Sequence, residues 1–204
     1  MKRLLTVLAV FAIFTLRADE RSAEILDKLS DAICRSKSYR IDFVSTVEGH
    51  RMQGYYTVSG NDYRIHTPET DIFCSDGVSY QIDDINREIV IEPTPESGKG
   101  DILSDPANAF SFLDRDYSHT FAGQAKAGGK TCYLILLKGK TDRQDIRLYV
   151  DTETSLPVRV EYFLENINSD AVIEVEKFSA DIGTPQLVPD LKRYKYYEII
   201  DFRQ

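Results

Sequence analysis

The chain has 204 residues, of which 42% are hydrophobic and 28% are charged, and its formal net charge at pH 7 is −8. These values are typical of an ordinary soluble globular protein, and the length suffices for one domain with a substantial core. The acidic balance argues against binding to nucleic acid and against simple electrostatic docking on anionic lipid, because phosphate groups repel a chain of like charge.

The N-terminus has the pattern of a secretory signal. Two basic residues at positions 2 and 3 precede an apolar run that ends at Leu16, and this run is shorter than the stretch of about 20 residues that crosses a bilayer as a helix. We therefore expect residues 1–18 to be an export signal removed near Ala18, leaving a single domain at 19–204. A retained anchor is the alternative, because Leu16 is large for its place in a cleavage site. Removal takes away three basic residues and no acidic ones, so the net charge changes from −8 to −11.

The three cysteines, Cys34, Cys74 and Cys132, are widely spaced and form no C-x-x-C pair. An odd number in an exported protein leaves at least one thiol unpaired. We expect small buried side chains, with one disulfide between two of them as the alternative. The histidines have no ligand spacing with the cysteines or with each other, so the sequence predicts no metal site and no cofactor.

The stretch 55–92 predicts an antiparallel meander. Turn sequences at 59–62, 75–77 and 83–86 separate short runs in which apolar and polar residues alternate, as in 63–66. Alternation with a period of two between Gly, Asn and Asp turns is typical of paired strands.

Two helices accompany the predicted strands. Ser22 can cap an amphipathic helix whose apolar stripe includes Ile33, and 101–114 predicts a second short helix that interrupts the sheet. Further strands are expected at 39–48, 117–122, 130–138, 145–150, 157–164 and 171–179, with an aromatic-rich strand or cap at 194–203.

These elements predict a mainly β, α+β fold. A large antiparallel sheet of about 10 to 11 strands must curl, and two short helices cover too little of its apolar face. We expect a half-open β-barrel closed by two or three short helices. Its interior is either a cavity or a packed core, and the pattern alone leaves both open.

The candidate cavity residues are apolar side chains expected on one face of the sheet and on both helices. Each of them could equally be an ordinary core residue, and a phase error of one residue would move a whole strand to the other face. They are Leu29 and Ile33 from the first helix, Phe43, Val47, Tyr56, Val58, Tyr63, Ile65, Ile72, Tyr80 and Ile82 from the sheet, and Phe110 and Phe112 from the second helix.

The order and spacing of several segments resemble a known family. The helix is followed by a strand after 36–39, by strands ending at the Asp76-Gly77 turn, and by the strand at 86–91; the blocks 147–161 and 199–203 follow later. This series resembles the LolA-type periplasmic carriers of outer-membrane lipoproteins, in particular the LolA-like lipoprotein chaperones, over nearly the whole mature chain.

The resemblance implies a periplasmic, non-enzymatic carrier that shields the acyl chains of lipoproteins in an apolar cavity. Acylated lipoproteins or lipids, an inner-membrane release complex and an outer-membrane acceptor would be its partners, and a monomer is expected. The alternative is a lipid- or lipoprotein-sensing protein with the same half-barrel.

The chain departs from the better-known carriers at Val58-Ser59-Gly60, where they often have an Arg, and at Tyr80-Gln81, near which they often have a Trp. No serine has a G-x-S-x-G frame, and the adjacent Asp83 and Asp84 diverge in a turn, which disfavours catalysis.

Overall fold

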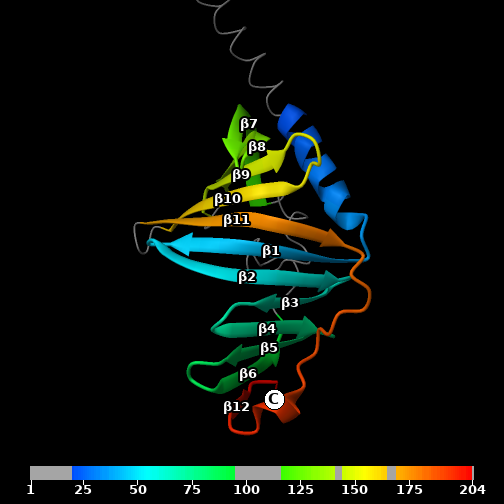
Figure 1. Cartoon of the computed structure of the whole chain (residues 1–204), viewed down its shortest axis with the longest axis vertical. Helices are drawn as coiled ribbons and strands as arrows, with labels where there is room; N and C mark the ends of the chain where they lie inside the picture. Colours follow the sequence, from blue (N-terminus) through cyan, green and yellow to red (C-terminus); the bar gives the residue numbers. More distant parts are fainter. Residues whose placement is uncertain (1–19, 95–115, 141–143, 165–168, 204) are drawn as a thin grey trace, which may run out of the picture. The chain divides into compact units, whose positions relative to one another are not determined.

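A computed structural model describes residues 20–94, 116–140, 144–164 and 169–203 (Figure 1). The predicted export signal and the predicted helix at 101–114, with Phe110 and Phe112, lie outside the described residues. The chain divides into two compact units, and the division falls within one strand, between Val172 and Ile173. Among the described residues, no helix combines the length and apolar character needed to cross a membrane.

The described residues contain twelve strands, one α-helix at 20–34 and one short 3-10 helix, η2. The number of strands is slightly higher than the predicted 10 to 11. Among the described residues one α-helix is present, fewer than the two or three closing helices of the prediction, of which the one at 101–114 is not described. The elements are β1 (Ser38–Val47), β2 (His50–Ser59), β3 (Asp62–His66), β4 (Thr70–Ser75), β5 (Val78–Asp83), β6 (Glu88–Pro93), β7 (Tyr117–Ala127), β8 (Lys130–Gly139), β9 (Ile146–Asp151), β10 (Pro157–Leu164), β11 (Ser169–Ala180), η2 (Leu191–Tyr194) and β12 (Glu198–Asp201).

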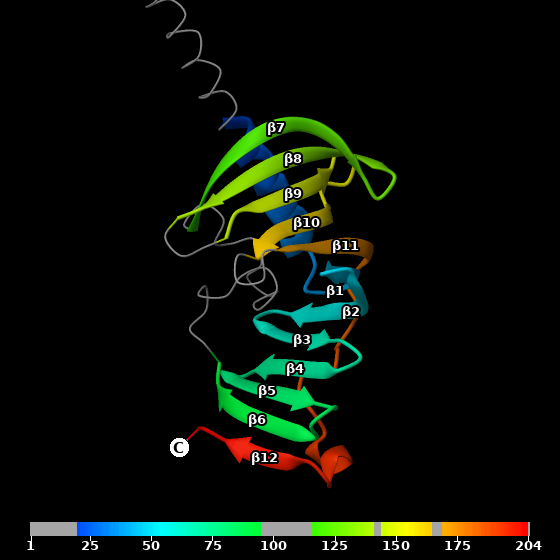
Figure 2. The same cartoon turned by 90° about the vertical axis from the view of Figure 1, so that its left-hand side faces the viewer.

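The first unit pairs β7, β8, β9 and β10 in sequence order, followed by the start of β11, and the helix lies across one face of these strands (Figure 2). Near its N-terminus, Ser22 Oγ lies 2.7 Å from His119 Nδ1 on β7. The guanidinium of Arg21 lies 4.4 Å from the centre of the Phe121 ring. Residues at spacing two on β8 and β9 form the buried face of the strands, namely Ile135, Leu137, Ile146, Leu148 and Val150.

Asp151 fixes the turn between β9 and β10. Its carboxylate accepts hydrogen bonds from Lys130 Nζ at 2.9 Å and from the Glu153 amide at 3.0 Å. Burial acts to raise the pKa of this carboxyl group, but these hydrogen bonds outweigh it and lower the pKa below the ordinary value of 3.8.

The lowered pKa of Asp151 predicts a loss of stability in acid. The folded state favours the carboxylate, so its contribution is complete above 3.8 and disappears as the pH falls through the lower folded value. We expect the free energy of unfolding to depend less steeply on pH in this acid range in Asp151→Asn than in the wild type, as measured by urea unfolding over a pH series. Glu20→Gln, which removes an exposed carboxyl group of the same unit, serves as the control. Equal slopes in the wild type, Asp151→Asn and this control would contradict the prediction.

The second unit has the strand order β11-β1-β2-β3-β4-β5-β6-β12. Pairing is antiparallel from β1 to β6, whereas β12 pairs with β6 in parallel. The prediction of an antiparallel sheet is therefore wrong for β12. The extended segment after β11 carries the chain to the far side of β6, so no hairpin dictates the direction of the last strand. In neither unit does the strand order return to its start, so the strands do not close into a barrel.

None of the three cysteines forms a disulfide. Cys74 and Cys132 are buried on strands as expected, but Cys34 is exposed, so the prediction of a buried side chain is wrong for Cys34. Burial raises the pKa of the Cys132 thiol, which keeps it protonated and unreactive.

Candidate functional site

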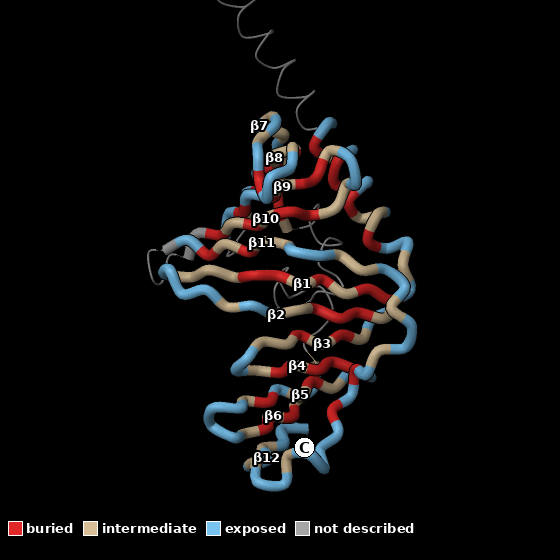
Figure 3. Tube along the Cα trace, viewed as in Figure 1, coloured by how far each residue is buried: buried red, intermediate tan, exposed pale blue. Residues whose placement is uncertain are grey.

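The register of β1 to β4 places one set of apolar side chains on a single face. Tyr39 is opposite Val58, Ile41 is opposite Tyr56, and both partners on β2 continue to β3. Directly opposite residues of paired strands lie on the same face. The set, called here the apolar face, consists of Tyr39, Ile41, Phe43, Tyr56, Val58, Tyr63, Ile65 and Cys74, all of which are at most 9% exposed (Figure 3).

An aromatic stack at Gly54 tightens the apolar face. The rings of Phe43 and Tyr56 stack with centroids 4.7 Å apart. Phe43 is opposite Gly54, and a Cβ at that glycine would lie 2.6 Å from Phe43 Cζ and 2.7 Å from the His66 carbonyl oxygen. The missing side chain therefore lets the Phe43 ring lie flat across β2.

The apolar face ends in a hollow at the β1–β2 hairpin. The hollow has a volume of about 690 Å³ and a mixed lining. Ser45, Val47 and Met52 line it on the side of the apolar face, and the other lining residues are His50, Arg51 and Gln53 of β2 with Pro68 and Glu69 of the β3–β4 turn. Met52 and Val47 are partly exposed here, so the end of this face is open to solvent.

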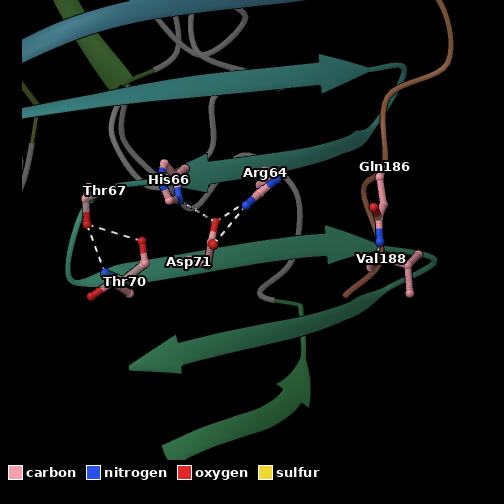
Figure 4. A network of polar contacts seen from close by, with 7 residues as sticks. All are labelled: Arg64, His66, Thr67, Thr70, Asp71, Gln186 and Val188. Carbon is pink, nitrogen blue, oxygen red and sulfur yellow. Dashed lines mark hydrogen bonds and ion pairs between the residues drawn. The ribbon is translucent and has the colours of Figure 1, made fainter. Parts of the chain in front are cut away.

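The opposite face of β3 and β4 carries a network of charged groups (Figure 4). Arg64 donates to both carboxylate oxygens of Asp71, from Nε at 2.7 Å and from Nη2 at 2.9 Å. His66 Nδ1 lies 3.0 Å from the same carboxylate. Asp71 is only 6% exposed, and its hydrogen bonds raise the pKa of Arg64. A bidentate pair at low exposure holds a fixed geometry, as expected of a structural element.

Aromatic rings complete this network. Arg40, which is paired with Asp42 at 2.6 Å, lies 3.6 Å from the centre of the Tyr55 ring, and Arg64 lies 4.8 Å from that of Phe73. Both guanidinium groups are thus held by a carboxylate and an aromatic ring. The charges of Arg40 and Arg64 are therefore satisfied within the sheet.

The predicted cavity residues fall into three groups. Seven strand residues share the apolar side of the second unit: Phe43, Val47, Tyr56, Val58, Tyr63, Ile65 and Ile72. Leu29 and Ile33 are buried in the helix of the first unit. Tyr80 and Ile82 lie on the opposite face, where Tyr80 is opposite Phe73 and Ile82 is opposite Asp71.

The placement of Tyr80 and Ile82 corrects the prediction that they share a face with Ile72. The two-residue turn Asp76-Gly77 makes Ser75 opposite Val78, which puts Ile72 opposite Gln81. A two-residue turn pairs even-numbered with odd-numbered positions here, so Ile72 and Tyr80 cannot lie on one face. Ile82 instead packs with Phe73, Ile89 and Ile91 under Tyr194 and Tyr197 of the C-terminal segment.

The candidate cavity residues did not include Tyr39, Ile41, Met52 and Cys74, which lie on this side of the sheet. Tyr39 and Ile41 alternate with Phe43 in the 39–48 strand, so the same periodicity could have identified them. Met52 is identified only by the hairpin register, in which it lies opposite Ser45.

A second hollow in the first unit has a volume of about 750 Å³ and a mixed lining that includes Leu136, Arg147 and Glu161. Glu161 pairs with Arg147 at 3.4 Å and with Arg159 at 2.7 Å. Both hollows thus have a mixed lining, and the one at the β1–β2 hairpin differs by lying at the end of the apolar face. Among the described residues, no group of His, Cys, Asp and Glu could hold a metal ion.

Comparison with known proteins gives similarity at the level of structure. No family model and no curated protein matches the chain. An uncharacterized conserved protein from Thermus thermophilus superposes with a TM-score of 0.62 at 11% identity, over 89% of this chain and 99% of that chain. A chain of the Pseudomonas aeruginosa MucA/MucB complex gives a TM-score of 0.52 at 16% identity, over 84% of this chain and 62% of that chain.

The LolA superfamily protein NE2245 from Nitrosomonas europaea is also similar, with a TM-score of 0.42 and 12% identity over 83% of this chain and 98% of that chain. The chain has a LolA-like fold, as the sequence resemblance predicted. At these identities the likeness concerns the fold alone.

Proposed function

We propose that the protein is a non-enzymatic periplasmic carrier that shields the acyl chains of lipoproteins on their way to the outer membrane. The observation that supports this most strongly is the continuous apolar face of β1 to β4, which ends in the solvent-open hollow beside Val47 and Met52. An alkyl chain would enter at the hollow, where Val47 and Met52 are partly exposed, because the residues of the apolar face are themselves at most 9% exposed. An inner-membrane donor and an outer-membrane acceptor would deliver and receive the cargo.

The energetics favour partial rather than full burial of the cargo. Each methylene group removed from water contributes about 0.8 kcal/mol, so complete burial of several long chains would make release very slow. An open hollow that receives part of a chain permits transfer to an acceptor. The acidic body supports the same role, because a chain of net charge −8 does not bind anionic membranes by charge.

A second candidate is a periplasmic sensor that binds a lipid or lipoprotein and reports it to another protein. The similarity to a chain of the MucA/MucB complex favours this candidate, since that structure is an assembly of two different proteins. A sensor should retain its protein partner on purification, whereas a carrier should retain acylated cargo.

The substitution Val47→Glu tests the binding role of the hollow. A carboxylate at this position would have to be desolvated by an alkyl chain, so we expect the affinity for a fluorescent long-chain fatty acid to fall about tenfold. The control is Thr46→Glu, which adds the same charge at the adjacent residue on the opposite face of β1. Fluorescence titration of both variants should show the loss for Val47→Glu alone. Equal affinities of the two variants would exclude the hollow as the binding site.

A further inference from the structure

The last strand of the second unit has one unpaired edge. β12 pairs with β6 on one side, and no described strand pairs with its other side (Figures 1 and 2). The amides of Glu198 and Phe202 donate to the carbonyl groups of Arg87 and Ile91 around this pairing. Because successive amides of a strand alternate in direction, those of Ile199 and Asp201 point to the unpaired side. The edge therefore presents backbone donors and acceptors to a further strand.

Two rows of side chains run across β5 and β6 and end at this edge. One is apolar: Ile82 is opposite Ile89, which is opposite Ile199. The first two are fully buried, whereas Ile199 is 52% exposed because the sheet stops there. The nearby Phe202 is 62% exposed. An apolar row that ends in exposed residues indicates a surface that can still be covered.

The other row is acidic and lies on the opposite face. Asp83 is opposite Glu88, which is opposite Glu198. The carboxylate of Asp83 accepts hydrogen bonds from the amides of Ile85 and Asn86, whereas Glu88 and Glu198 are neighbours of like charge. A basic side chain beyond Glu198 would relieve this repulsion.

We propose that the free edge of β12 binds an extended segment of another protein, which adds to the sheet as a further strand. The segment carries a basic residue beside Glu198, followed by apolar residues beside Ile199 and Ile200. Backbone hydrogen bonds provide affinity, and the side-chain rows set the sequence preference. The surface is separate from the apolar face of β1 to β4, so its function does not depend on acyl-chain binding.

Charge favours a basic partner over a second copy of this chain. The strand β12 contains no basic residue, so pairing with another β12 would leave the repulsion between Glu88 and Glu198 unrelieved. Asp201 is already paired with Arg203 at 2.6 Å, which leaves Glu198 as the carboxylate that a basic side chain would meet.

The test uses a fluorescein-labelled, threonine-flanked peptide with the core Lys-Val-Val-Lys, which suits either strand direction. Its counterpart has the core Glu-Val-Val-Glu. We expect the intact protein to bind the lysine peptide in anisotropy titrations and to prefer it to the glutamate peptide. We also expect the hydrogen exchange of the Ile199 and Asp201 amides to slow at least tenfold on binding, as measured by NMR.

Charge reversal provides the matched variants. Glu198→Lys should weaken binding of the lysine peptide about fivefold or more and favour the glutamate peptide, without loss of stability because the contact with Glu88 becomes attractive. Glu153→Lys, at an exposed turn of the first unit, changes the net charge equally and should leave binding unchanged. Three results would each overturn the proposal: equal weakening in both variants, unaltered exchange at Ile199 and Asp201, or dimerisation of the protein through β12 in sedimentation experiments.

Discussion

Replacement of Asp71 with alanine is expected to lower the free energy of unfolding by about 3 kcal/mol, because it leaves the guanidinium of Arg64 partly buried without its carboxylate. The pair is bidentate, with N–O distances of 2.7 and 2.9 Å, and Asp71 is almost fully buried. Removal of one partner of such a pair costs more than the pair contributes in the intact protein. Urea unfolding followed by circular dichroism measures the change.

The pair of Arg40 and Asp42 is the matched control. It has a similar N–O distance of 2.6 Å, but its side chains are 38% and 28% exposed, against 25% and 9% for Arg64 and Asp71. Asp42→Ala should therefore cost less than about 1 kcal/mol. The double variant Arg64→Met with Asp71→Leu should recover much of the stability lost in Asp71→Ala, since it leaves no unpaired charge. Equal costs for Asp71→Ala and Asp42→Ala would show that burial does not govern these pairs.

Replacement of Gly54 with alanine is expected to destabilise the protein by about 2 to 3 kcal/mol. The new Cβ would lie 2.6 Å from Phe43 Cζ and 2.7 Å from the carbonyl oxygen of His66. The ring can shift, but the carbonyl belongs to β3, which is paired with β2 at Tyr55 and His66. In a strand with space for a methyl group, the same change would stabilise the fold by about 0.5 to 1 kcal/mol. A loss of stability in Gly54→Ala would therefore indicate that Gly54 is in close contact with Phe43 and His66, whereas a gain would indicate free space at this position.

A second substitution separates the two contacts at Gly54. Phe43→Leu in the Gly54→Ala background shortens the side chain that the new methyl group meets, so thermal unfolding should show partial recovery relative to Gly54→Ala alone. Recovery should be incomplete because the His66 carbonyl is backbone. A Gly54→Ala protein as stable as the wild type would contradict the packing described here.

Local signals in the sequence predicted most of the strands. Alternation at 63–66 after the turn at 59–62 identified β3, and the spacing of Ile146 and Leu148 in the strand predicted at 145–150 identified β9. These features depend on residues close in sequence, so periodicity and turn chemistry suffice. The number of strands was close to correct for the same reason.

Non-local pairing accounts for what the sequence did not predict. The parallel pairing of β12 with β6 joins Glu198 to Glu88, and no turn of the chain specifies that neighbour. The network of Arg64 and Asp71 was missed because the two residues lie on different strands and looked like solvated charges on a polar face. The face of Tyr80 was wrong although the Asp76-Gly77 turn fixes it, because the strands were not placed in register.

The most direct test of the proposed carrier function is native mass spectrometry of the protein purified under mild conditions from the periplasm of its own cells. The proposal predicts complexes heavier than the chain alone by the mass of an acylated lipoprotein or lipid, and the Val47→Glu variant should carry markedly less of this mass than Thr46→Glu. A protein that emerges with no bound lipid or lipoprotein would contradict the proposed function.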